Sequence, residues 1–163
     1  YFLGEHGFFD KRYIYEPSLR MPTVVKMPSQ EKSNQRVGEL LLNTDFAPTL
    51  LSAAGLIVPE SMQGKSFLPL LKEQEMDSYA PRDAIYYRYW NNDDQRPAHF
   101  GIRTERYKLV YFYGLETGAW ELYDLQQDPN ESQNLYPSVS GEEWVAALKA
   151  QLKREQQLAG DSY

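Results

Sequence analysis

The stretch Tyr107-Lys108-Leu109-Val110-Tyr111-Phe112-Tyr113 is the clearest structural signal in this sequence of 163 residues. Aromatic and β-branched residues fill it, and such side chains favour the half-buried surface of a β-sheet. Similar runs separated by turn-forming residues lie nearby, at residues 84–90, 100–104 and 120–125. Because short connections join antiparallel neighbours, the sequence predicts a four-stranded antiparallel meander.

A helix is predicted after these strands, over residues 141–158. Its apolar residues recur close to the helical period, with Glu142 and Glu143 in the first turn and Lys153 and Arg154 late. We expect this amphipathic helix to cover one face of the sheet.

The N-terminal half has a different pattern, in which a loop, a short strand and a helix are predicted. Residues 1–20 resemble a structured loop that depends on glycines, and residues 21–28 are predicted to form a short buried strand. A helix is predicted over residues 44–55, ended by Gly55. The fold class is therefore α/β leading into α+β. The polar stretch before residue 82 suggests a boundary, dividing the chain into residues 1–80 and 81–163.

Composition excludes several functions. Seventeen Lys and Arg against 23 Asp and Glu give a net charge of −6, which disfavours an extended nucleic-acid surface. The absence of cysteine excludes disulfides, thiolate zinc sites and a cysteine nucleophile within this sequence. We see no membrane-spanning run and no secretory signal. The start at Tyr1, without Met, leads us to expect a piece of a longer chain.

The densest group of reactive side chains lies between Gly4 and Arg12. Lys11 and Arg12 could together hold a tetrahedral anion beside Asp10, and His6 could act as a ligand or an acid–base group. The same residues also fit a solvated turn with weak surface ion pairs and a histidine bonded within its own turn. Both interpretations stay open on the residues alone.

His99 marks a second candidate surface, because it begins a predicted strand beside Arg96 and Arg103 and could contact a sugar hydroxyl or a carboxylate. It also fits an ordinary loop histidine. The neighbouring aromatic residues could form a carbohydrate platform or the core of the sheet. Neither histidine has a partner at zinc-ligand spacing, and no serine lies in a Gly-x-Ser-x-Gly frame, so catalysis by this chain alone is not expected.

The sequence resembles the type I sulfatases of the alkaline phosphatase superfamily, especially N-acetylglucosamine-6-sulfatases. The resemblance covers nearly the whole chain in five ordered motifs: Leu3-Gly4-Glu5-His6-Gly7 with Asp10-Lys11-Arg12, Asp45-Phe46-Ala47-Pro48-Thr49, Met62-Gln63-Gly64-Lys65-Ser66, Gly101-Ile102-Arg103-Thr104 with Tyr107-Lys108-Leu109, and Glu121-Leu122-Tyr123-Asp124 with Asp128-Pro129.

The resemblance implies roles for particular residues. Lys11 would contact the substrate sulfate, Asp10 and Arg12 would hydrogen-bond the sugar, His6 would support the pocket, and His99 would help to select the substrate. It also implies a formylglycine nucleophile and calcium, whose residues would lie upstream of Tyr1. The Cys/Ser-x-Pro-x-Arg motif of the family is absent here.

On this resemblance, residues 1–80 would end the catalytic α/β domain and residues 81–163 would form a C-terminal subdomain. The expected function is hydrolysis of sulfate esters on glycosaminoglycan-type sugars, in partnership with the missing N-terminal part, in the periplasm, the lysosome or outside the cell. We expect the chain alone to be inactive. The alternatives are a non-catalytic carbohydrate-binding module and a related phosphate or phosphonate hydrolase.

Overall fold

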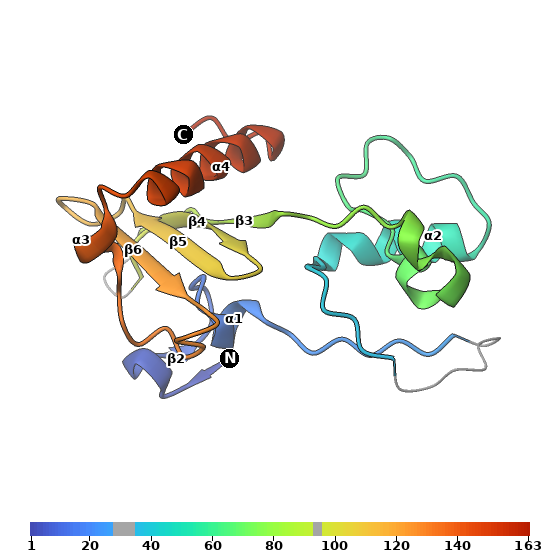
Figure 1. Ribbon diagram of the computed structural model, residues 1–163, viewed down its shortest axis with the longest axis horizontal. Helices are drawn as coiled ribbons and strands as arrows, with labels where there is room; N and C mark the ends of the chain where they lie inside the picture. The colour runs from blue at the N-terminus through green and yellow to red at the C-terminus, as the bar shows by residue number, and fades with distance from the viewer. Residues whose placement is uncertain (28–34, 93–95) are drawn as a thin grey trace. The chain divides into compact units, whose positions relative to one another are not determined.

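The antiparallel sheet predicted from the sequence is present. The structure is a computed structural model that describes residues 1–27, 35–92 and 96–163. Four strands, β3 (Ala84–Tyr89), β4 (His99–Thr104), β5 (Tyr107–Phe112) and β6 (Ala119–Asp124), pair in sequence order, each antiparallel to the next (Figure 1). The meander is confirmed, and His99 belongs to β4 itself, opposite Tyr89 on β3 and Phe112 on β5.

One face of this sheet is covered by the last helix, α4 (Glu143–Leu158), as the sequence predicted (Figure 1). Val145 and Leu152 of α4 are buried against apolar side chains of the strands, among them Ile102 and Leu109. A short helix, α3 (Tyr136–Val139), precedes it. The apolar stripe of the helix and one apolar face of the sheet thus form a common core.

The opposite face is covered by the first residues of the chain, which the sequence did not predict (Figure 1). This segment contains β1 (Phe2–Leu3), the 3₁₀ turn η1 (Glu5–Gly7), β2 (Phe9–Asp10) and α1 (Glu16–Leu19). A second core joins it to the strands, made of Phe2, Tyr13, Ile14, Tyr15, Val110, Phe112 and Tyr123. Residues 1–22 and 84–163 therefore form one compact unit.

Residues 23–83 form a separate compact unit. It contains η2 (Asn43–Asp45), α2 (Phe46–Ala53), η3 (Leu68–Leu71) and η4 (Glu73–Ser78). The helix predicted over residues 44–55 is confirmed, and Gly55 follows it with a φ of +71°, the left-handed conformation that favours glycine. Buried Asp45 accepts hydrogen bonds from the backbone N–H groups of Leu42 and Lys65 and from the guanidinium of Arg82.

The strand predicted over residues 21–28 is wrong for the part that the structure describes. Residues 21–27 form no strand, and the Val24 side chain is 94% exposed. A short apolar run becomes a strand only when neighbouring strands satisfy its backbone and cover its side chains. No such neighbour pairs with it among the described residues.

The division into residues 1–80 and 81–163 concerns the domains of a longer protein and stays a prediction. Within this chain, the first 22 residues pack with the sheet that begins at Ala84. None of the helices in the described residues is long and apolar enough to cross a membrane.

Candidate functional site

The loop over residues 4–12 adopts an unusual backbone; it is called the substrate loop because the sequence resemblance predicts that it contacts the substrate. Gly4 and Gly7 have φ values of +129° and +74°, as expected for glycines that shape a turn. His6, Asp10 and Arg12 also have positive φ, at 53°, 80° and 95°. Non-glycine residues rarely adopt this region, and they cluster at functional sites.

The three charged residues at the end of this loop divide into a pair and a single cation. Arg12 lies 3.2 Å from a carboxylate oxygen of Asp10, and both side chains are more than a third exposed. The Lys11 Nζ lies 5.2 Å from the centre of the Tyr1 ring. Among the described residues no acidic side chain forms an ion pair with Lys11. The loop therefore presents an ammonium group without an acidic partner among the described residues, and such a group can bind an anionic ligand.

His6 lies at the tip of the same loop, where it stacks on an aromatic ring. Its imidazole lies 4.6 Å from the ring of Tyr15 with an interplanar angle of 10°. Tyr15 is buried, so it provides a fixed support for the exposed histidine. Asp10, Lys11, Arg12 and His6 thus lie in one loop, which follows from their closeness in the sequence.

His99 lies apart from these four residues. Its side chain is fully buried between aromatic rings, with centroids 5.5 Å from Tyr13 and 5.0 Å from Phe112. Tyr13 in turn stacks on Phe8 of the substrate loop at 4.3 Å. The described contacts therefore connect His99 to the loop through two rings and not directly.

The hydrogen bonding of His99 defines its chemistry. Nδ1 lies 2.8 Å from the carbonyl oxygen of Pro97, and because a carbonyl only accepts, Nδ1 carries the proton. Nε2 is then an acceptor, and it is buried without a hydrogen-bond partner among the described residues. Burial lowers the pKa of His99, which favours the neutral ring. This nitrogen could accept a hydrogen bond from a hydroxyl group.

The aromatic platform that the sequence suggested is mostly core. Tyr86, Tyr111, Tyr113 and Trp120 pack against the core under α4, and Phe112 and Tyr87 belong to the opposite one. Tyr89 lies outside both clusters and contacts His99, with ring centroids 5.7 Å apart. Trp90 is 64% exposed, and the Arg88 guanidinium lies 3.8 Å from its ring centre. These contacts support the interpretation of the aromatic residues as sheet core.

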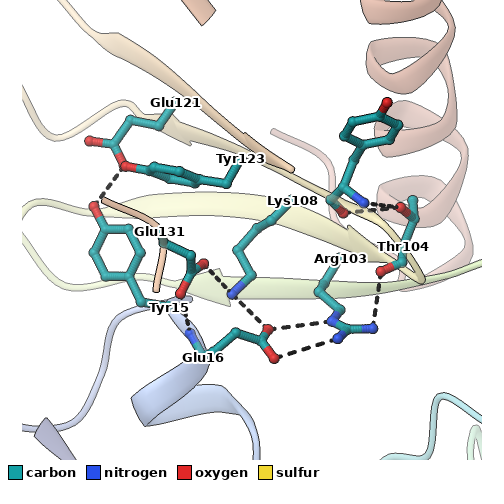
Figure 2. A network of polar contacts seen from close by, with 9 residues as sticks. Tyr15, Glu16, Arg103, Thr104, Lys108, Glu121, Tyr123 and Glu131 are labelled. Atoms are coloured by element: carbon teal, nitrogen blue, oxygen red, sulfur yellow. Dashed lines mark hydrogen bonds and ion pairs between the residues drawn. The ribbon is translucent and has the colours of Figure 1, made fainter. Parts of the chain in front are cut away.

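A network of charged side chains joins α1 to the sheet and was not predicted (Figure 2). The Lys108 Nζ lies 2.9 Å from Glu16 Oε1 and 2.6 Å from Glu131 Oε1. Burial would raise the pKa of Glu16, but Lys108 and Arg103 lower it overall. Burial raises the pKa of Glu131, although Lys108 opposes the change. Glu131 has a φ of +54°, in the left-handed region that non-glycine residues rarely adopt.

Metal binding was expected only from residues outside this chain. Within the described part of the chain, no three His, Cys, Asp or Glu side chains gather as a metal ion would require. The chain also lacks cysteine. The described residues therefore offer a charged loop but no metal centre.

Comparison with known proteins gives one consistent result. The family model described as "N-sulphoglucosamine sulphohydrolase, C-terminal" matches residues 4–158. The chain is 40% identical over 138 residues to an N-acetylglucosamine-6-O-sulfatase of Bacteroides thetaiotaomicron, covering 83% of this chain and 25% of that protein. It is 30% identical over 156 residues to an arylsulfatase of Clostridium perfringens, covering 94% of this chain and 31% of that one.

A solved structure of a protein in complex with its substrate D-glucosamine-2-N,6-O-disulfate is also similar. It aligns with a TM-score of 0.83 and 36% identity, over 99% of this chain and 33% of that chain. A 2-O glycosaminoglycan sulfatase aligns with a TM-score of 0.60 and 28% identity, over 73% of this chain and 25% of that chain. The chain thus spans a quarter to a third of the length of these relatives.

Proposed function

The chain belongs to the N-sulphoglucosamine sulphohydrolase C-terminal family, and on that premise we propose that it forms the C-terminal portion of a sulfatase. The longer protein would hydrolyse sulfate esters of glycosaminoglycan-type sugars such as 6-sulfated N-acetylglucosamine. The similarity to an N-acetylglucosamine-6-O-sulfatase and to a structure holding a disulfated glucosamine supports this substrate class. The full-length protein would act outside the cytosol.

The observation that carries the proposal is the exposed Lys11, which has no ion-pair partner among the described residues, on a loop with positive φ at His6, Asp10 and Arg12. Hydrolysis of a sulfate ester breaks the S–O bond and moves negative charge onto the bridging oxygen of the leaving alcohol, next to sulfate oxygens that are already anionic. An ammonium group held beside these oxygens stabilises that charge most in the transition state. Lys11 would therefore contact the sulfate and lower the barrier to release of the alcohol.

The neighbouring residues would orient the sugar. The Asp10 carboxylate can accept a hydrogen bond from a sugar hydroxyl, and the Arg12 guanidinium, 3.2 Å from it, can donate to one. His6 would support the pocket through its stack on Tyr15. His99 would help to select the sugar through its acceptor nitrogen, after a rearrangement that exposes it.

The family resemblance implies that a formylglycine supplies the nucleophile and that calcium neutralises the sulfate oxygens. Because the described residues include no gathered metal ligands, we propose that both groups reside in the missing N-terminal part. The 163-residue chain alone would then bind weakly and turn over nothing. Detectable sulfate release by the purified chain would contradict this assignment.

The direct test is sulfate release from N-acetylglucosamine-6-sulfate by the full-length protein that contains this chain. Lys11→Ala should lower kcat/KM by roughly 10²- to 10³-fold, the typical effect of removing one charge-stabilising donor. Lys153→Ala, an exposed lysine on α4, is the matched control. An unchanged rate in Lys11→Ala would refute its role. Faster hydrolysis of a phosphate or phosphonate ester than of the sulfate ester would favour the related hydrolases.

A further inference from the structure

The backbone of the substrate loop needs support from outside the loop. Residues with left-handed φ such as His6, Asp10 and Arg12 are strained and persist only where the surroundings fix them. A hydrogen bond from Gly4 N–H to the Phe8 carbonyl closes the tip. At the charged end, the Arg12 N–H donates to Ser18 Oγ at 3.0 Å, and Ser18 lies on α1. The position of Arg12 therefore depends on where α1 sits.

Buried charges fix α1 on the sheet (Figure 2). Glu16, the first residue of α1, receives Lys108 Nζ at 2.9 Å and Arg103 Nε at 3.3 Å on Oε1. Its backbone N–H donates to Glu131 Oε2 at 2.6 Å, and Glu131 in turn contacts Lys108. Side chain and backbone of Glu16 are thus held at once, which fixes the helix in both position and orientation.

The segment that holds α1 on the sheet also supports His6. Tyr15, directly before Glu16, donates its O–H to Glu121 Oε2 at 2.6 Å, and Glu121 accepts a second hydrogen bond from Tyr123 (Figure 2). The same Tyr15 ring supports the His6 imidazole. His6 at the tip of the loop and Arg12 at its charged end therefore both depend on residues 15–18.

We propose that Glu16, Lys108 and Glu131 are positioning residues that hold the substrate loop in its productive conformation. This inference rests on the proposed function, in which the loop contacts the sulfated sugar. Apolar side chains of similar volume could fill the same space. Apolar side chains could not accept a hydrogen bond from the Glu16 N–H or pair with the Glu16 carboxylate. They would therefore leave the position of α1 on the sheet undetermined.

The test compares Lys108→Met with Lys149→Met in the full-length protein that contains this chain. Lys149 lies on α4, where it is half-buried, donates to Tyr136 and contacts aromatic rings, so the control removes a lysine from the other side of the sheet without touching α1. We expect Lys108→Met to shift the backbone amide NMR signals of residues 4–12, and Lys149→Met to leave them in place. Unshifted loop signals in a folded Lys108→Met chain would overturn the proposal.

A second variant keeps the test decisive if Lys108→Met does not fold. Lys108→Met/Glu131→Met removes both fully buried charges, and the Glu16 carboxylate keeps Arg103 at 3.3 Å as its partner, so the fold should be retained. The loop signals should still shift, and wild-type signals in the double variant would overturn the proposal.

Activity provides a readout that is specific to positioning. In the full-length protein the double variant should lower kcat/KM by roughly 10- to 100-fold, because misplacement by about 1 Å can cost that much. The same change should cost less in a Lys11→Ala background, since the two effects share one contact. Equal losses in both backgrounds would refute positioning. Shifted loop signals with no sulfate hydrolysis by the wild type would instead refute the proposed function.

Discussion

Replacement of Asp45 by alanine tests how residues 23–83 are held together. This carboxylate is fully buried and accepts four hydrogen bonds. Two come from the N–H groups of Leu42 and Lys65, each at 2.7 Å, and two from the Arg82 guanidinium at 2.7 and 2.5 Å. A single side chain thus joins three segments that are distant in sequence.

The expected loss is large. Asp45→Ala leaves a guanidinium that is only 15% exposed without its partner, and breaking a buried pair from one side costs about 3–5 kcal/mol. That is a large part of the roughly 5–15 kcal/mol that stabilises a typical domain. Arg82→Met should also destabilise, and the double variant should lose less than the sum, by about 0.5–3 kcal/mol, because the two residues interact directly.

Urea unfolding combined with hydrogen exchange at the Lys65 amide measures this effect locally. The control is Glu75→Ala, which breaks an exposed pair with Lys72 at 2.9 Å, where the side chains are 42% and 48% exposed. Such surface pairs contribute about 0–1 kcal/mol. If Asp45→Ala lost no more stability than Glu75→Ala, the role of Asp45 as the central anchor would be refuted.

Three further predictions concern the sheet unit. Burial lowers the pKa of His99, so as the pH drops below about 6.5 the unfolded chain takes up a proton first and the free energy of unfolding should fall. Urea midpoints measured across this pH range should fall less in His99→Gln than in the wild type. Identical pH profiles for the two proteins would contradict the burial of His99. Gly101→Ala would place Cβ 2.4 Å from the Leu109 carbonyl oxygen and 2.9 Å from Ile14 Cδ1, so we expect thermal unfolding to show a loss of about 1–3 kcal/mol, and an unchanged Tm would argue against that close approach. Leu152→Ala should cost about 2–5 kcal/mol in unfolding followed by circular dichroism, whereas a loss below that range would show that α4 adds little to the core.

The sheet could be predicted because its signal is local. Aromatic and β-branched runs separated by turns specify strands and antiparallel order, and observed β5 at Tyr107–Phe112 differs from the predicted run by one residue. The same is true of α4, whose period is visible in its own sequence. The run over residues 21–28 had a comparable composition but finds no pairing partner among the described residues, so composition alone was misleading there.

The buried charges could not be predicted because their cover is distant in sequence. Lys108 alternates with apolar neighbours as a solvent-facing strand residue would, yet residues 1–22 cover that face and leave it fully buried. Glu131 follows Asp128-Pro129-Asn130, a turn signal that normally marks the surface. The charged residues of the substrate loop, by contrast, were found because they are adjacent along the chain.

The hydrogen bond between the Glu16 N–H and Glu131 joins residues that are 115 positions apart, and this separation has a consequence in time. A ribosome adds about 5–20 residues per second, so the loop at the start of this sequence would wait on the order of ten seconds for its anchor. During that interval the Glu16 N–H lacks the carboxylate that accepts it, although Lys108 and Arg103 can already pair with its side chain. A chain whose synthesis stops before residue 131 would contain all four strands and still lack this hold on α1.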